Sequence, residues 1–152
     1  MRSRLFAHAV LVAGLSAVVL GAPAVAASDQ STACVFTTQL RAENEVPTST
    51  STAFGHTQIK VRSDGTIQWK THIFNPNNET FVAGHIHIAP AGEPGPVVQP
   101  LFTGPNSSSE IIDSGSTSNA TLGAQICAEP AAYYVNYHTT ANLPGAIRGQ
   151  LG

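Results

Sequence analysis

The chain has 152 residues, of which 42% are hydrophobic and 11% are charged. Its seven Lys and Arg residues and nine Asp and Glu residues give a formal net charge of −2. This balance argues against nucleic acid and membrane surfaces as partners, because binding to either is driven by an excess of clustered positive charge.

The N-terminal segment has the pattern of a secretory signal. Arg2 and Arg4 form a short basic region, and an almost uninterrupted apolar run follows from Leu5 to Leu20. Small residues come next, where a signal peptidase needs them. The run is shorter than the roughly 20 residues that span a membrane. We therefore expect residues 1–27 to be a signal peptide, and residues 28–152 to form one secreted domain.

The two cysteines of the chain, Cys34 and Cys127, both lie beyond the predicted signal. In an oxidising extracellular compartment, an even number of cysteines favours a disulfide. We predict a bond between Cys34 and Cys127 that ties the first strand of the domain to a late one. The alternative is a pair of separate buried thiols or a metal-binding pair, which the sequence alone leaves open.

The mature chain consists of short runs with β-branched or aromatic residues at alternate positions, separated by turn-forming residues. No run shows the spacing of apolar residues that is typical of an amphipathic helix. Eight such runs predict an all-β domain, a Greek-key β-sandwich or barrel of about eight antiparallel strands. The predicted strands are Cys34 to Arg41, Phe54 to Arg62, Thr66 to Phe74, Phe81 to Ile88, Val97 to Phe102, Ala120 to Cys127, Ala132 to His138 and Ala146 to Leu151.

Three histidines form a candidate metal site. Side chains two residues apart in a strand point to the same face, so His85 and His87 share one face of their predicted strand. His138 ends a later strand in the same context, after an apolar residue and before a hydrophilic turn. Three imidazoles are the number that a catalytic-type metal site uses. The pattern therefore predicts a site for copper or zinc, with copper favoured by the order of metal affinities.

The alternative for these histidines is a structural role, in which they form hydrogen bonds with loop carbonyls and hold the turn from Pro90 to Pro96. Glu45 lies in a loop before a proline, where its carboxylate either reaches the site or faces water, and we expect it to be exposed. The short connection before the last strand should fold that strand back and bring Arg148 next to Asn136. We expect Arg148 to be a structural hydrogen-bond clamp, with anion or substrate binding as its less favoured role.

Four separated blocks stand out along the mature chain. They are Asn44-Glu45-Val46-Pro47, His85-Ile86-His87 with Gly95-Pro96-Val97-Val98, Tyr134-Val135-Asn136-Tyr137-His138-Thr139 and Gly145-Ala146-Ile147-Arg148-Gly149-Gln150-Leu151. Their order and spacing resemble those of the CHRD domain, the module named after chordin. The resemblance covers nearly all of the mature chain and implies a secreted β-sandwich domain. Three positions depart from the usual family pattern, since Gly84 stands in place of Ala, Thr48 in place of Pro and Ala146 in place of Glu.

A fainter likeness is to Cu,Zn superoxide dismutase, in which a His-x-His strand of a Greek-key barrel supplies copper ligands and a late histidine completes the set. No histidine lies between His87 and His138, so the bridging imidazole and the zinc loop of that enzyme have no evident counterpart.

These observations favour a secreted CHRD-type binding module with a possible copper or zinc site, whose partner is a metal ion or an extracellular protein. Two alternatives remain. An extracellular protein-interaction or matrix module without metal would show an apolar patch on a sheet face. A metal-dependent enzyme, dismutase-like or other, would need an open ligand position in an accessible cleft.

Overall fold

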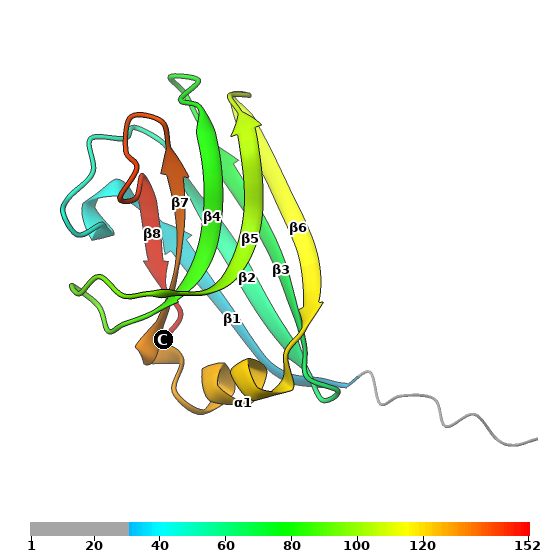
Figure 1. Ribbon diagram of the computed structural model, residues 1–152. Helices are drawn as coiled ribbons and strands as arrows, with labels where there is room; N and C mark the ends of the chain where they lie inside the picture. The colour runs from blue at the N-terminus through cyan, green and yellow to red at the C-terminus, as the bar shows by residue number, and fades with distance from the viewer. Residues whose placement is uncertain (1–30) are drawn as a thin grey trace, which may run out of the picture.

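The computed structural model describes residues 31–152, which form two four-stranded antiparallel sheets packed face to face (Figure 1). The strand order is β1-β2-β3-β6 in the first sheet and β5-β4-β7-β8 in the second. The predicted signal peptide, residues 1–27, lies outside the described residues. Among the described residues, no helix is both long enough and apolar enough to span a membrane.

The observed elements confirm the all-β sandwich prediction. A single α-helix, α1 (Ala120–Ala128), and two short 3-10 helices, η1 (Ala42–Asn44) and η2 (Pro130–Ala132), connect strands of the described chain. The strands are β1 (Thr32–Leu40), β2 (Phe54–Arg62), β3 (Thr66–Phe74), β4 (Phe81–Ile88), β5 (Val97–Asn106), β6 (Glu110–Ser118), β7 (Tyr133–Thr139) and β8 (Ile147–Gln150).

One predicted strand is wrong, because the segment from Ala120 to Cys127 forms the helix α1. The side chain of Asn119 accepts a hydrogen bond from the backbone N–H of Leu122 at 3.1 Å, which caps the first turn. Leu122 and Ile126 are buried and lie four residues apart, so they share one face of the helix. In this short segment, the cap and this one apolar pair outweigh the β-like alternation.

The two larger departures from the predicted strands, apart from α1, are both in strands at a sheet edge. Strand β6 was not predicted, because its serines and glycine hide the alternation, yet it pairs with β3 along its whole length. Strand β5 continues beyond Phe102 to Asn106 although it contains Pro100 and Pro105. Proline lacks a backbone donor and is tolerated in an edge strand, where one row of backbone groups has no partner strand.

The core lies between the two sheets. The residues of each strand that alternate inward meet those of the opposite sheet, and the outward residues are left to solvent or to covering loops. Trp69, which the strand pattern places on the inward face of β3, is partly buried and packs against this core. The core includes Leu40, Ile59, Val61, Ile67, Ile73, Phe81, Ile86, Ile111, Val135, Tyr137 and Ile147.

A polar network lies within this core and links both sheets. The hydroxyl of Tyr137 in β7 lies 2.8 Å from Asp113 Oδ2 in β6 and 2.8 Å from Thr71 Oγ1 in β3. Trp69 donates its indole N–H to the same carboxylate oxygen at 3.1 Å, and Thr57 Oγ1 lies 2.7 Å from Thr71 Oγ1. Burial raises the pKa of Asp113 and, well above its ordinary value, the pKa of Tyr137.

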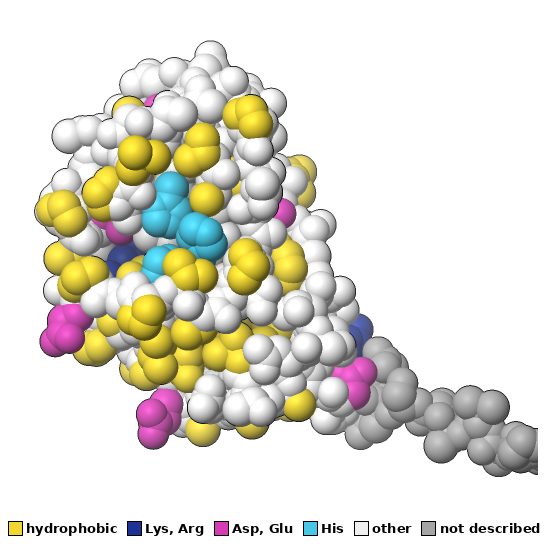
Figure 2. Space-filling model, viewed as in Figure 1, with side chains coloured by type: hydrophobic (Ala, Val, Ile, Leu, Met, Phe, Trp, Pro, Cys, Tyr) yellow, Lys and Arg dark blue, Asp and Glu magenta, His cyan; other side chains and the backbone are white. Residues whose placement is uncertain are grey.

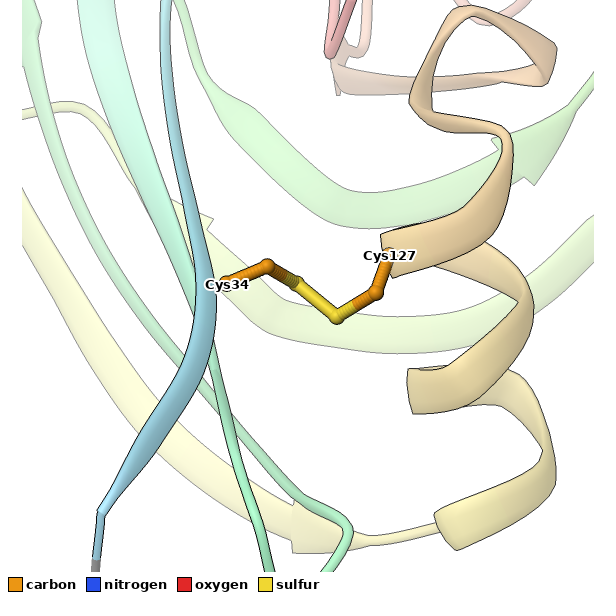
Figure 3. Close-up of a disulfide and its surroundings, with 2 residues drawn as sticks. All are labelled: Cys34 and Cys127. Carbon is orange, nitrogen blue, oxygen red and sulfur yellow. A yellow bond between two sulfur atoms is a disulfide. The ribbon is translucent and has the colours of Figure 1, made fainter.

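The predicted disulfide is confirmed. Cys34 in β1 is bonded to Cys127, with 5.8 Å between the two Cα atoms (Figure 3). Cys127 belongs to α1 and not to a strand as predicted, so the bond fastens the helix to the first sheet. The two residues are 93 positions apart. Closing so long a loop stabilises a domain by about 4 to 5 kcal/mol in the chain-entropy account.

Candidate metal centre

The three predicted histidines lie on the outer face of the second sheet. His85 and His87 in β4 point away from the core, whereas Ile86 between them is fully buried in it. The antiparallel register of β4 and β7 places Ala83 opposite His138, so that His138 projects from the same face as His85 and His87. Strand alternation and register thus bring residues 53 positions apart to one place.

The structure brings all three imidazoles into one cluster. One ring nitrogen of each histidine lies within 4.8 Å of those of the other two. His85 Nδ1 and His138 Nε2 are hydrogen-bonded at 3.0 Å. In Figure 2, histidine side chains gather on this face, reach the surface and are flanked by hydrophobic side chains. His87 and His138 are buried, and His85 is partly exposed.

Two backbone carbonyls fix which nitrogens can bind a ligand. His87 Nδ1 lies 2.8 Å from the carbonyl oxygen of Gly95, and His138 Nδ1 lies 2.8 Å from that of Leu143. A carbonyl oxygen only accepts hydrogen bonds, so each Nδ1 carries the proton and each Nε2 keeps its lone pair. His85 Nδ1 must then donate to His138 Nε2. The loop-holding role considered as the alternative therefore uses Nδ1 of His87 and His138. It leaves Nε2 of His87 without a partner and Nε2 of His138 to accept the bond from His85.

Burial keeps these imidazoles neutral. Together with the neighbouring His138 and His87, whose effects are smaller, it lowers the pKa of His85 to about 4. Burial also lowers the pKa of His87 and of His138, against the opposing effects of their hydrogen bonds with loop carbonyls. A metal ion binds imidazole only in its neutral form. At neutral pH the cluster therefore needs to lose no proton before it can bind a cation.

Three buried polar atoms around Asn136 have no hydrogen-bond partner among the described residues. They are His87 Nε2, Asn136 Oδ1 and Glu45 Oε1. Asn136 adjoins the other two side chains, since its amide raises the pKa of His87 and lowers that of Glu45. Buried polar groups normally find a partner, because leaving one unpaired costs about 1 to 3 kcal/mol. A polar ligand or ion that contacted these atoms would satisfy them.

The expectation that Glu45 is exposed is wrong, because only 4% of the residue is accessible. The backbones of Arg41 and Arg148 exchange two 3.0 Å hydrogen bonds, which carry η1 and the following loop across to the second sheet. Burial raises the pKa of Glu45 to about 7, although Asn136 and Arg148 lower it. The carboxylate lies so close to Gly145 that a methyl group there would overlap it.

Arg148 lies next to Asn136, as predicted from the short connection between β7 and β8. Its guanidinium is buried and donates to the carbonyl oxygens of Glu93 at 2.8 Å and Pro90 at 3.0 Å. It also stacks over the ring of Tyr134, 3.4 Å from the ring centroid. These contacts clamp the loop after β4, and they commit most of the guanidinium donors to this chain.

Tyr134 is a residue of this site that the sequence reasoning missed. Its ring stacks on the ring of His87 with centroids 4.8 Å apart, and its hydroxyl accepts the backbone N–H of Gly95 at 3.2 Å. Gly95 is therefore held by both side chains, which fixes the orientation of His87. The available signal was strand parity, since Tyr134, Asn136 and His138 alternate on one face of β7.

The family model of the CHRD domain matches residues 36–151, which is nearly the whole of the described chain. The chain belongs to the CHRD domain family. No curated protein and no solved structure matches it. Family membership supports the coarser functional prediction of an extracellular binding module, and the disulfide fits such a compartment.

Two departures from the usual CHRD pattern have local consequences here. A Cβ atom at Gly84 would overlap the ring of Tyr137, so the glycine leaves room for the tyrosine of the core network. Ala146 is fully buried, and it gives this CHRD domain a methyl group where the family usually has a carboxylate. Glu45, from the loop after η1, lies close enough to Arg148 of β8 for the two side chains to interact electrostatically.

The cluster can offer three neutral imidazole nitrogens to one cation. Three protein ligands suit a tetrahedral zinc ion with a fourth position open to solvent or a partner, and an all-nitrogen set also suits copper. Within residues 31–152, no second group of three or more His, Cys, Asp or Glu side chains has metal-binding geometry. The described chain thus has no counterpart of the separate zinc site of Cu,Zn superoxide dismutase.

Proposed function

We propose that this CHRD domain is an extracellular binding module that holds one copper or zinc ion on His85, His87 and His138. The observation that carries the proposal is the buried Nε2 of His87, which has no partner among the described residues and keeps its lone pair because Nδ1 is bound to Gly95. A ring nitrogen oriented by a carbonyl on its other side is the usual arrangement of a metal-ligating histidine.

Binding at His85 and His138 would replace the hydrogen bond between them. That bond uses His85 Nδ1 and His138 Nε2 at 3.0 Å, so both groups already face each other. His85 can present a lone pair after its proton moves to the other ring nitrogen, with no change in the charge of the ring. Copper is the favoured ion, because divalent copper binds nitrogen ligands more tightly than zinc does.

The proposal is tested by isothermal titration of Cu(II) or Zn(II) into protein purified without chelator or metal-affinity tag. We expect one ion per chain. His85→Ala and His138→Ala should each remove most of the binding. His72→Ala is the matched control, because His72 lies on the outer face of the first sheet, where its Nε2 is 3.2 Å from Glu110 Oε2.

The metal affinity measured in the same titration should decrease at low pH. Protons compete with the metal for the ring nitrogens, and burial lowers the pKa values of all three histidines. Affinity should therefore stay nearly constant through about pH 6.5, the ordinary histidine pKa, and fall only as the pH drops towards the lowered pKa values, that of His85 being about 4. Absence of binding in the parent, or unchanged binding in both the His85 and His138 variants, would contradict the proposal.

A protein-interaction module without metal is the second candidate, and one observation favours it. Apolar side chains flank the histidines on the face seen in Figure 2. Leu143, whose carbonyl binds His138, is 67% exposed, and Val97 and Ile88 beside the β4 histidines are 48% and 39% exposed. Replacing Leu143 and Val97 with Ser would weaken binding of a protein partner while leaving the metal titration unchanged.

A further inference from the structure

The positive charge of the described chain is concentrated on the outer face of the first sheet. Residues 31–152 contain five Lys and Arg residues. Lys60, Arg62 and Lys70 alternate outward with respect to the buried core residues of β2 and β3. Arg41 follows β1 and donates to Gln39 Oε1 on the same face at 3.2 Å. Only Arg148 lies elsewhere, buried in the second sheet.

Negative charge is nearly absent from the same rows of side chains. Among the outward positions of β1, β2, β3 and β6, the one acidic side chain is Glu110, which lies 3.2 Å from His72. The opposite face, in Figure 2, shows little Lys or Arg. Although the net charge of the chain is −2, charge is therefore distributed unevenly between the two outer faces, and that of the first sheet carries a local excess of positive charge.

This face is also hollowed. Two adjoining depressions cross it, and they share Gln58 of β2 and Lys70 of β3, which are paired across the strands. The two depressions therefore adjoin at these residues, and together they are here called the sheet groove. Its other lining residues include Lys60, Gln68, Ser114 and Ser116 in one half, and Thr37, His56, His72 and Ile112 in the other.

Neutral hydrogen-bonding groups outnumber charges in the sheet groove, and some are held in place. Gln58 Nε2 donates to Thr37 Oγ1 at 3.4 Å, and Arg62 Nε donates to Gln68 Oε1 at 3.1 Å. Amide side chains present a donor and an acceptor side by side, which suits neighbouring hydroxyl groups on a ligand.

One end of the sheet groove is aromatic and apolar. The ring of His72 lies 4.3 Å from the ring of Phe74, and Phe74 stacks on Phe54 at 5.2 Å. Ile112 beside them is 67% exposed. Such a flat surface suits the C–H faces of a sugar ring, whereas the amides and hydroxyls suit its edge.

We propose that the sheet groove binds an acidic polysaccharide, an extended chain of hydroxylated sugars that carry carboxylate or sulfate groups. Lys60 and Lys70 lie diagonally across the β2–β3 pair and would meet the anionic groups. Gln58, Gln68 and the serines of β6 would bind hydroxyl groups between them. An acidic peptide would also pair with the lysines, but it would offer few hydroxyl groups to hydrogen-bond with the neutral amide and hydroxyl side chains of the groove.

The test measures binding of polygalacturonate oligomers of defined length to the full chain, by isothermal titration at low ionic strength in metal-free buffer. Neutral dextran oligomers and poly-L-glutamate of similar length serve as probes of hydroxyl recognition alone and of charge alone. We expect the polygalacturonate to bind more tightly than either. Affinity should fall with added salt, because Lys70 is exposed and Lys60 is partly exposed.

Three variants locate the binding. Lys60→Gln combined with Lys70→Gln should lower the affinity about tenfold, as expected for loss of two charge pairs at the protein surface. Thr121→Glu combined with Gln125→Glu on α1 makes the same change in net charge at exposed positions away from the groove and should have little effect. His85→Ala should also leave this binding unchanged, which separates the result from the metal proposal.

Three outcomes would overturn the proposal: no binding of polygalacturonate, equally tight binding of poly-L-glutamate, or equal losses in the lysine variant and the α1 variant. Gln58→Leu sharpens the second comparison, because it removes an amide without changing charge. It should weaken binding of polygalacturonate and leave any binding of poly-L-glutamate unchanged. Near-UV circular dichroism of each variant establishes that the native fold is retained.

Discussion

Strand β7 carries a polar network on each face, and the two networks differ in how completely they are paired. On the inner face, Tyr137 joins Asp113 and Thr71 through contacts of 2.8 Å, and no buried side-chain atom of that network lacks a partner. On the outer face, Asn136 and His87 each keep an unpaired buried atom. Residues adjacent in the sequence thus belong to regions with different physical requirements.

This difference in hydrogen-bond pairing indicates different roles for the two networks. A fully paired buried network links the two sheets and gains nothing from a ligand. An incompletely paired network is costly unless something else satisfies its atoms. The outer network has the added feature that loop carbonyls fix its histidine tautomers. The inner network therefore has a structural role, and the outer one has the properties of a binding site.

The largest predicted effect on stability belongs to the inner network. Tyr137→Phe removes the buried hydroxyl that binds the half-buried Asp113 carboxylate, and should lower the free energy of unfolding by about 3 kcal/mol. Urea denaturation measures this loss. Metal affinity should not change, because the histidines lie on the other face of the sheet. A stability loss below about 0.5 kcal/mol would mean that the network is not structural.

An intermediate effect is predicted for Glu45, through pH. Because burial raises the pKa of Glu45 to about 7, the folded protein binds a proton more tightly than the unfolded chain. Its contribution to stability is present at low pH and is lost as pH rises from about 4.5, the unfolded pKa, to about 7.

In the Glu45→Gln variant this contribution to the pH dependence of stability is absent, because glutamine does not ionise. Parent stability relative to this variant should therefore rise by about 2 kcal/mol as the pH falls from about 8 to about 5. Urea titrations of both proteins at each pH give the difference. If the difference in stability between the two proteins stayed constant between these pH values, Glu45 would have the pKa of an ordinary surface carboxylate, which would contradict this prediction.

The smallest effect is predicted for Asn136. Its Oδ1 has no hydrogen-bond partner among the described residues, so Asn136→Leu removes an unpaired buried oxygen, together with the amide that lowers the pKa of Glu45, while keeping the side-chain size similar. We expect a stability change of less than about 1 kcal/mol, in contrast to Tyr137→Phe. A loss as large as that of the tyrosine variant would mean that the outer network is paired and structural as well.

Strand parity and chemistry predicted the parts of this protein that depend on local pattern. The sequence placed His85 and His87 on one face, and it predicted both the pairing of Cys34 with Cys127 and the proximity of Arg148 to Asn136. Each of these depends on alternation, on a short connection or on the number of cysteines, all of which can be read without knowing the fold.

The features that the sequence did not reveal depend on long-range packing. Burial of Glu45 follows from two backbone hydrogen bonds between Arg41 and Arg148, which are distant in the chain. Strand β6 is recognisable only beside β3, because its own serines show no apolar alternation. In α1, the Asn119 cap was the available signal, and it was outweighed by apparent β alternation.

The most direct test of the central claim is a two-bond ¹H–¹⁵N correlation spectrum of the histidine rings in metal-free protein, repeated after addition of one equivalent of Zn(II). Before addition, His87 and His138 should be neutral at pH 7 with the proton on Nδ1, as their hydrogen bonds to Gly95 and Leu143 require. Zinc should then shift the Nε2 resonances of both rings, together with a ring nitrogen of His85, and leave those of His56 and His72 in place. Protonated Nε2 atoms in the metal-free protein, or cluster resonances that do not respond to zinc, would contradict the account.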